Sequence, residues 1–285
     1  MRPVNSTAGI LRSMTVEGVA RRFVAAVVIG LSIAWLVWTL NGFTLSDAHA
    51  YRMAAERLIA GNPLYQATPS QDDAFRYAPW FAAAWVPIAS LPRALGDGLW
   101  AVALVAASVA AVIPFARRPG LASRLVAIFG GTMLLWTAAR GNVHPLMIAG
   151  LVHGIDRRSG PLWIGLAASL KAVPIVFTLV YLARREWWRA ALSVAVAIFL
   201  VAPMPLLGWD PGRTNPGESL SLWYLASPVV WATAAGLTLG GALLVARRYP
   251  RYIGPAAAAA AILALPRLLL YDLTYVLVGT EPLDG

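Results

Sequence analysis

Apolar stretches alternate with short polar and basic segments along almost the whole chain of 285 residues. The apolar stretches lie at about 23–41, 79–92, 98–116, 125–139, 143–155, 160–183, 190–208, 226–246 and 253–279. A helix needs about 20 apolar residues to cross a bilayer, so several stretches are long enough, whereas 143–155 is short and is expected to tilt or to line a cavity. The pattern predicts an all-α fold, a polytopic transmembrane helical bundle of about 9–11 hydrophobic segments.

Two of the stretches are interrupted by a charge close to a proline. Lys171 and Pro174 interrupt 160–183, and Pro266 and Arg267 interrupt 253–279. Broken helices at membrane depth line water-filled or protein-lined spaces, so we expect each stretch to form a hairpin of two short helices. We expect a cytoplasmic N-terminal segment (1–22), one transmembrane domain (23–279) and a C-terminal tail (280–285).

The composition excludes most soluble classes of protein. Hydrophobic residues make up 59% of the chain and charged residues 13%, against roughly 45–50% and about 25% in soluble domains. The chain has no cysteine, which excludes disulfides, thiolate metal sites and thiol nucleophiles, and only three histidines, His49, His144 and His153. We therefore expect neither a bound metal nor a cofactor.

The net charge of +10 reflects membrane orientation rather than a nucleic-acid partner. If the N-terminus and four later connections are cytoplasmic, they hold 15 of the 23 Lys and Arg residues: Arg2, Arg12, Arg21, Arg22, Arg117, Arg118, Arg124, Arg157, Arg158, Arg184, Arg185, Arg189, Arg247, Arg248 and Arg251. This arrangement requires 79–116 to cross the membrane only once. The excess of Arg over Lys, with abundant Ala, is typical of a GC-rich bacterial genome. We expect a multi-pass protein of the bacterial cytoplasmic membrane, with its N-terminus cytoplasmic and a polar cavity on the extracytoplasmic face.

The first predicted extracytoplasmic loop, 44–78, begins with a short amphipathic helix over 44–61. Thr44 and Asp47 have the spacing of a capping box, and Arg52 and Glu56 are placed to pair one turn apart. Asp47 can be an ordinary helix N-terminal carboxylate or a reactive group facing protein and lipid headgroups. An alternative is a secretory signal peptide, in which Ala48-His49-Ala50 imitates a cleavage site.

Several motifs follow one another along the chain: Asp47 and Tyr51, Gly61-Asn62-Pro63-Leu64-Tyr65, Phe75-Arg76-Tyr77-Ala78-Pro79, Arg140-Gly141-Asn142-Val143-His144-Pro145-Leu146, the Lys171-Ala172-Val173-Pro174 hairpin with its basic-aromatic turn at 184–189, Leu265-Pro266-Arg267 and Tyr271-Asp272. In this order they resemble glycosyltransferase family 87, the polyprenol-phosphate-mannose-dependent α-mannosyltransferases, which are membrane enzymes of the C-type glycosyltransferase fold. The resemblance covers roughly 44–279. Asn142 stands where the family usually has Gln, His144 stands where it usually has Asn, and the chain is shorter than typical members.

The resemblance implies a polyprenyl-phosphate-linked sugar as donor, a glycolipid or cell-wall glycan as acceptor, and the lipid bilayer as surroundings. It implies inversion with Asp47 as the general base, at the position of the fold's first-loop aspartate. The chain's only lysine, Lys171, and the arginines Arg267, Arg140 and Arg76 are the candidates for binding the donor phosphate. The candidates for binding the sugar or the acceptor are Tyr51, Tyr77, Asn142, His144, Tyr271 and Asp272.

Other interpretations stay open for these residues. Lys171 can snorkel to the interface without a ligand, and the polar side chains can be interhelical contacts. Asp72 and Asp73 can bind a divalent cation, but adjacent acids in a loop are more often solvated. Trp209, Trp223 and Tyr224 are typical of an interfacial aromatic belt. The whole chain can instead be a transporter or flippase of a lipid-linked glycan, or a degenerate relative that acts as an assembly subunit.

Overall fold

The computed structural model of the chain describes residues 7–42, 44–65, 74–209 and 219–280, and every regular element in these ranges is helical. The α-helices are α1 (Thr7–Asn41), α2 (Ser46–Ile59), α3 (Pro79–Ala89), α4 (Arg93–Ala116), α5 (Leu121–Ala139), α6 (His144–Gly154), α7 (Gly160–Leu170), α8 (Thr178–Ala183), α9 (Trp187–Val201), α10 (Leu222–Leu225), α11 (Pro228–Arg248), α12 (Ile253–Leu263) and α13 (Tyr275–Thr280). The 3-10 helices are η2 (Val173–Phe177), η3 (Pro205–Leu207), η5 (Pro250–Tyr252) and η6 (Leu270–Thr274).

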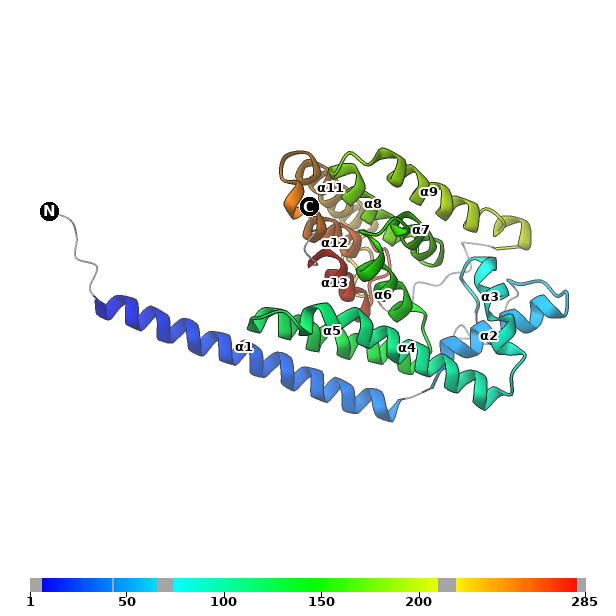
Figure 1. Cartoon of the computed structure of the whole chain (residues 1–285), viewed down its shortest axis with the longest axis horizontal. Helices are drawn as coiled ribbons and strands as arrows, with labels where there is room; N and C mark the ends of the chain where they lie inside the picture. The colour runs from blue at the N-terminus through cyan, green and yellow to red at the C-terminus, as the bar shows by residue number, and fades with distance from the viewer. Residues whose placement is uncertain (1–6, 43, 66–73, 210–218, 281–285) are drawn as a thin grey trace.

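Five helical segments are long and apolar enough to cross a membrane: Gly18–Asn41, Arg93–Ala116, Leu121–Ala139, Trp187–Leu207 and Pro228–Arg248. Shorter apolar segments, including Gly160–Leu170 and Leu270–Gly279, pack among them. The prediction of an all-α, polytopic membrane bundle is therefore confirmed. Figure 1 shows α1 extended along α5 at one side of the bundle, with α2 and α3 together at the end far from the N-terminus.

The first interrupted stretch, 160–183, folds back on itself. Helix α7 ends at Leu170, and Lys171 is extended, with φ −139° and ψ 120°. Pro174 lacks an amide hydrogen and disfavours helical backbone at the residue before it, which explains why α7 does not continue. The chain returns through η2 and α8, so that Arg184 forms an ion pair of 2.6 Å with Asp156, which lies just before α7. Both ends of the hairpin therefore lie at the same end of the bundle.

The second interrupted stretch, 253–279, also folds back. Helix α12 ends at Leu263, and the chain is extended at Leu269 before η6 and α13. Gly254 and Gly279 then meet so closely that a Cβ on either would collide with the backbone of the other. Such contacts between small residues let helices approach closely in membranes. The charges beside prolines therefore predicted both places where the chain reverses direction.

Helix α4 is long enough to cross the membrane, whereas α3 is a short apolar helix. Arg52 of α2 is buried and donates hydrogen bonds to the carbonyl oxygens of Ala89 (2.9 Å), the last residue of α3, and of Leu91 (3.3 Å), just beyond the helix. It also lies 3.6 Å from Asp97, in the first turns of α4. The predicted pair of Arg52 with Glu56 is therefore wrong, because the unsatisfied carbonyls at the end of α3 attract the guanidinium more strongly. Both ends of α3 lie beside the loop that carries α2.

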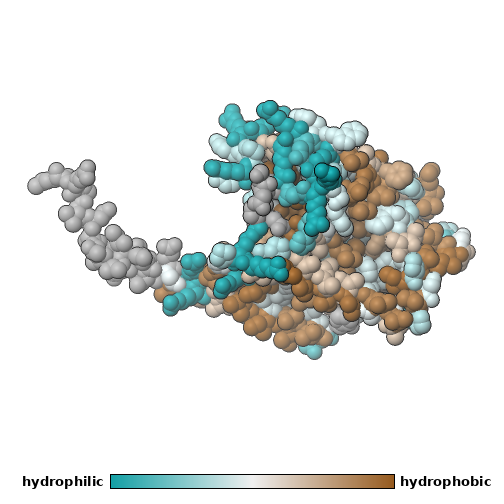
Figure 2. All heavy atoms as spheres, viewed as in Figure 1, coloured by the Kyte–Doolittle hydropathy of each residue, from teal (hydrophilic) through white to brown (hydrophobic). Residues whose placement is uncertain are grey.

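The bundle has two chemically different ends. We call the end that holds α2 and Asp47 the Asp47 end, and the opposite one the arginine-rich end. Near the Asp47 end, the indole of Trp100 in the first half of α4 donates a hydrogen bond to the carbonyl oxygen of Gly141. Farther along α4, the carbonyl oxygen of Ala110 lies 2.8 Å from Nε2 of His153, near the end of α6. Helix α4 therefore runs from the Asp47 end to the arginine-rich end. The connections after α4, α6, α8 and α11 carry the basic residues of the arginine-rich end. Figure 2 shows hydrophilic residues gathered on one part of the visible face, with apolar residues over most of the rest.

Candidate functional site

Asp47 stands in the first turn of α2 and is held there by the turn after α5. Its amide donates a 2.8 Å hydrogen bond to the carbonyl oxygen of Arg140, and the amide of Leu45 donates one of 3.1 Å to that of Ala139. The cap residue is Leu45, with φ 49°, and no side chain caps the helix. The predicted capping box of Thr44 and Asp47 is therefore wrong, because backbone carbonyls from a distant turn take the amides that a cap would satisfy.

Gly141 allows this close approach. Its φ is +75°, a left-handed conformation that favours glycine. A Cβ at this position would lie 2.6 Å from the Cβ of Ala48 and 2.9 Å from its amide nitrogen. The carbonyl oxygen of Gly141 accepts a 2.8 Å hydrogen bond from the indole of Trp100. The first turn of α2 is thus pressed against a glycine that α4 holds in place.

Asn142 orients the Asp47 carboxylate. Its side-chain amide donates hydrogen bonds to Oδ2 of Asp47 at 2.8 Å and to the hydroxyl of Tyr77 at 3.4 Å. Its Oδ1 accepts a 2.9 Å bond from the amide of His144. Donor and acceptor atoms of this buried amide are all used, so its orientation is well determined. Asp47 is half-buried and keeps an exposed part of its surface.

Tyr51 and Tyr77 continue the network. Their hydroxyls lie 3.2 Å apart, and the Tyr51 hydroxyl accepts a 3.3 Å hydrogen bond from the amide of Val143. Burial and the Asp47 carboxylate together raise the pKa of Tyr77 to about 12, and burial raises the pKa of Tyr51 well above its ordinary value. Both phenols are therefore neutral hydrogen-bonding groups at physiological pH.

Lys171 lies at the turn of the first hairpin and meets the start of η6. Its ammonium lies 3.3 Å from Oδ1 of Asp272 and 3.2 Å from the hydroxyl of Tyr271, and it sits 4.3 Å from the centre of the Tyr271 ring. Oδ2 of Asp272 accepts a bond from the amide of Leu269. Lys171 has the charged partner that a cation in an apolar segment requires, and part of its side chain stays exposed.

The Asp47 and Lys171 charges share one site. Asn142 links the Asp47 carboxylate to the Tyr77 hydroxyl, and His144, two residues later, packs edge-on against Tyr271, whose hydroxyl lies 3.2 Å from the Lys171 ammonium. The indole of Trp80, at the start of α3, donates a 2.9 Å hydrogen bond to Oγ of Ser169, two residues before Lys171. This bond ties the loop that carries Asp47 and Tyr77 to the hairpin that carries Lys171.

His144 is fully buried behind this site. Its Nε2 lies 2.8 Å from Oγ1 of Thr274, and its ring packs edge-on against the rings of Tyr271 and Tyr275. His144 therefore connects the turn that holds Asn142 to the segment that holds Tyr271.

The three candidate arginines occupy different places. Arg140 contributes its carbonyl to the placement of Asp47. Arg267 lies between Pro266 and Leu268, whose carbonyls accept hydrogen bonds from Ser221 and Ser219, and its buried Nε has no partner among the described residues. Arg76 is half-buried and directly precedes Tyr77.

Comparison with known proteins then identifies the family. The family model described as glycosyltransferase family 87 matches residues 75–271, which is more than half of the chain. The chain belongs to glycosyltransferase family 87. It is similar to the polyprenol-phosphate-mannose-dependent alpha-(1-2)-phosphatidylinositol pentamannoside mannosyltransferase of Mycolicibacterium smegmatis, with 29% identity over 180 residues. The aligned region is 58% of this chain and 44% of that relative, so the chain spans less than half of the relative's length. No solved structure matches the chain.

The family match includes Tyr77, Asn142, Lys171 and Tyr271, whereas Asp47 lies before its first residue. The site thus joins matched segments to a loop that precedes them. Among the described residues no group of three His, Asp or Glu side chains could hold a metal ion. Asp72 and Asp73 lie outside the described residues.

Sequence reasoning did not select three residues that build the site: Gly141, Trp80 and Ser169. Gly141 carried a signal, because a glycine between two predicted membrane helices marks a turn or a close backbone approach. The bond between Trp80 and Ser169 joins residues 89 positions apart, and no local pattern predicts it.

Proposed function

We propose that this member of glycosyltransferase family 87 transfers a mannosyl residue from a polyprenyl phosphate to a hydroxyl of a glycolipid or cell-wall glycan. The observation that carries the proposal is that Asn142 donates hydrogen bonds to the Asp47 carboxylate and to the Tyr77 hydroxyl, while His144, two residues later, packs against the Tyr271 ring that the Lys171 ammonium contacts. Sugar transfer from a phosphate needs both charges in one site. The name of the mycobacterial relative supports mannose and polyprenyl phosphate as the donor components.

In the proposed step, Asp47 acts as the general base. The acceptor oxygen attacks the anomeric carbon of the donor, and the bond from that carbon to the phosphate oxygen breaks, so that the polyprenyl phosphate leaves with the bonding electrons. The proton of the acceptor hydroxyl passes to the Asp47 carboxylate. Attack opposite the leaving group inverts the anomeric centre. Asn142 is a positioning residue, because it holds Oδ2 of Asp47 and thereby sets the orientation of the carboxylate.

Lys171 balances the charge that develops on the departing phosphate. Its ammonium is paired with Asp272, so a phosphate would share this cation with a buried carboxylate. Arg267 is the second candidate, because a buried Nε without a partner among the described residues suits an anionic ligand. The carbonyl oxygen of Arg140 accepts a hydrogen bond from the Asp47 amide, and Arg76 directly precedes Tyr77 in the chain. Both arginines are further candidates for binding the phosphate.

The sugar and the acceptor would contact the hydroxyls and amides that border these charges. Tyr77 and Tyr271 are half-buried and can donate to sugar oxygens. Tyr51, Asn142 and Asp272 are buried, and His144 has no exposed surface, so we assign them to positioning Tyr77, Asp47, Lys171 and Tyr271.

We further propose that the arginine-rich end faces the cytoplasm of a bacterium and that the Asp47 end faces outward. The excess of basic residues at one end supports this orientation by the positive-inside rule. Each hairpin enters and leaves at the arginine-rich end, α3 stays at the Asp47 end, and α4 crosses the membrane once. The basic connections after α4, α6, α8 and α11 are then all on the same side of the membrane. Because the chain has no cysteine, single cysteines at Asn62 and at Arg185 can be tested with a membrane-impermeant maleimide in intact cells. Labelling at Asn62 alone is expected, and labelling at Arg185 alone would reverse the orientation.

The direct test of the activity is Asp47→Asn, assayed in membranes with labelled polyprenyl-phosphate-mannose. We expect loss of transfer without loss of protein, because the amide cannot accept the proton. The matched control is Glu56→Gln, an exposed acid in the same helix, which should transfer at the wild-type rate. Undiminished transfer by Asp47→Asn would eliminate the assignment of the base.

Two other outcomes would replace the proposal. Movement of the lipid-linked sugar across the bilayer without a new glycosidic bond would indicate a transporter or flippase. Binding of the donor by the wild-type chain, with neither transfer nor movement, would indicate a non-catalytic assembly subunit.

A further inference from the structure

Two connections at the arginine-rich end of the bundle are joined into one surface. Arg189, in the first turn of α9, donates hydrogen bonds to the carbonyl oxygens of Ile155 (3.0 Å) and Arg157, which lie between α6 and α7. Arg184, just after α8, forms an ion pair of 2.6 Å with Asp156. These contacts hold the two connections against each other. We call the joined segments the paired turns: residues 155–159 and 184–189.

The paired turns carry more cations than acids. Both acids that the structure describes there are occupied, because Asp156 pairs with Arg184 and Glu186 pairs with Arg189 at 2.7 Å. Three other arginines have exposed side chains and form no ion pair with the described residues: Arg157, Arg158 and Arg185. An anion that approaches the paired turns therefore meets three guanidinium groups for which no described carboxylate competes.

Two helices begin at the paired turns and direct their N-terminal ends toward this surface. Helices α7 and α9 pack along each other (Figure 1), and they run in the same direction. A Cβ at Gly160 would meet the guanidinium of Arg189, and one at Gly165 would meet the side chain of Val196 farther along both helices. Neither helix has a side-chain cap. The positive ends of both helix dipoles therefore add to the charge of the arginines.

Exposed tryptophans place the paired turns at the depth of the lipid headgroups. Trp187 and Trp188, in the first turn of α9, are 65% and 77% exposed, and Trp163, in the first turn of α7, is 41% exposed. Indole rings collect at the boundary between membrane and water, where an apolar body and a polar N–H are both satisfied. At this depth the anion within reach is the phosphate of a lipid, and guanidinium groups bind phosphate oxygens in pairs. A zwitterionic headgroup brings its own cation, so the excess of arginines favours an anionic lipid.

We propose that the paired turns bind the headgroup of an anionic phospholipid, with its phosphate on Arg157, Arg158 and Arg185. Free phosphate has the same chemistry, but the bilayer holds the lipid beside the exposed tryptophans. The bound headgroup would bridge the two ends of the first hairpin and stabilise it, because it binds the paired turns only when they are joined. The proposal does not depend on the transfer reaction, since the paired turns lie at the end of the bundle opposite Asp47.

The first test is the melting temperature of the purified full-length chain in a neutral detergent. The chain is titrated with phosphatidylglycerol, with phosphatidylcholine or with inorganic phosphate. We expect a saturable increase with phosphatidylglycerol alone, and we expect high salt to remove most of it. An equal increase with phosphatidylcholine, or no increase with phosphatidylglycerol, would overturn the proposal. An equal increase with inorganic phosphate would overturn the lipid as the source of the anion.

The second test removes cations from two places at the same end of the bundle. The test variant changes the three exposed arginines of the paired turns: Arg157→Gln, Arg158→Gln and Arg185→Gln. The matched control changes three exposed arginines at the ends of α4 and α11: Arg117→Gln, Arg247→Gln and Arg248→Gln. We expect the apparent affinity for phosphatidylglycerol to fall roughly tenfold or more in the test variant and to stay near the wild-type value in the control. Equal losses would show that the lipid responds to the net charge of the whole end, which would contradict a site at the paired turns.

The third test uses the wild-type chain and does not require any variant to fold. A phosphatidylglycerol with a diazirine on its headgroup is incorporated into nanodiscs with the chain, and labelled peptides are mapped by mass spectrometry after irradiation. We expect labelling to concentrate in 155–163 and 184–190 and to be removed by excess phosphatidylglycerol but not by excess phosphatidylcholine. Labelling of equal strength at the ends of α4 and α11 would refute the proposed site.

Discussion

The side-chain amide of Asn142 donates a 2.8 Å hydrogen bond to Oδ2 of Asp47, joining residues 95 positions apart. Asn142 is itself fixed by the amide of His144, which donates to its Oδ1. The carboxylate of the first loop is therefore oriented by a turn between two bundle helices. This relationship makes Asp47 part of a rigid site rather than a side chain at the end of an exposed helix.

Replacing Asn142 by Asp should change the pH dependence of transfer. Two carboxylates would then lie at hydrogen-bonding distance, and they cannot both ionise easily. The acid side of the kcat–pH profile should shift to higher pH, because the pair retains a proton where Asp47 alone has lost it. Asn41→Asp, which adds the same charge at an exposed position, should leave the profile unchanged. An unshifted profile in Asn142→Asp would argue against a role of Asn142 in orienting the base.

Gly141→Ala should disturb both stability and transfer. The new methyl group would meet Ala48 at 2.6 Å on a backbone with φ +75°. We expect a loss of about 1–3 kcal/mol in the free energy of unfolding and a fall in kcat as the first turn of α2 moves. Gly236→Ala is the control, because nothing lies within 4 Å of a Cβ there and α11 should be stabilised by up to about 1 kcal/mol. Equal melting temperatures in detergent for the two variants would contradict the close approach.

Lys171 and Asp272 should depend on each other for stability. Lys171→Gln leaves the buried Asp272 carboxylate without its cation and is expected to cost about 3–5 kcal/mol. Adding Asp272→Asn should recover most of this stability, because no uncompensated charge remains. The double variant should still transfer poorly, with a raised KM for the donor. A double variant that regains wild-type transfer would show that Lys171 serves packing alone.

Tyr77 should make the chain lose stability at alkaline pH. Burial and the Asp47 carboxylate raise its pKa from 10.0 to about 12, so the folded chain holds this proton more tightly than the unfolded chain. The associated stability is complete below pH 10 and is lost as the pH rises from about 10 to about 12. The melting temperature of Tyr77→Phe should therefore fall less steeply over this interval than that of the wild type. Tyr224→Phe, at an exposed position, should follow the wild type, and identical slopes for all three chains would refute the assignment.

Much of the fold follows from one-dimensional patterns, because the bilayer imposes simple rules. Apolar length predicted the helices, and a charge near a proline located both turns, at Lys171 and before η6. These rules work because an unsatisfied backbone or an unpaired charge at membrane depth is costly.

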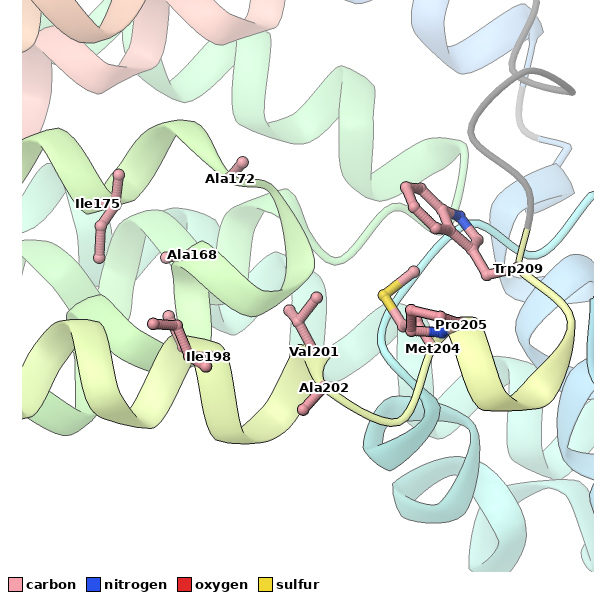
Figure 3. Close-up of a pocket in the computed structure, with 10 residues that line it drawn as sticks. Ala168, Ala172, Ile175, Ile198, Val201, Ala202, Met204, Pro205 and Trp209 are labelled. Carbon is pink, nitrogen blue, oxygen red and sulfur yellow. The ribbon is translucent and has the colours of Figure 1, made fainter.

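The sequence was less informative where distant segments supply hydrogen bonds. Arg52 was expected to pair within its helix, but the carbonyls at the end of α3 hold it. The start of α2 was expected to be capped by its own side chains, but Ala139 and Arg140 provide its partners. An apolar groove between the first hairpin and α9 could not be predicted either, because Ala172 of the hairpin and Ala202 after α9 line it together only once these two segments have packed against each other (Figure 3).

The most direct test of the account is a structure of the full-length chain in nanodiscs with a non-hydrolysable mannosyl polyprenyl phosphonate bound. The account predicts that Nζ of Lys171 contacts the phosphonate and that the Asp47 carboxylate faces the anomeric carbon from the side opposite the phosphonate. A phosphonate bound away from Lys171, or an Asp47 side chain turned away from the sugar, would contradict it.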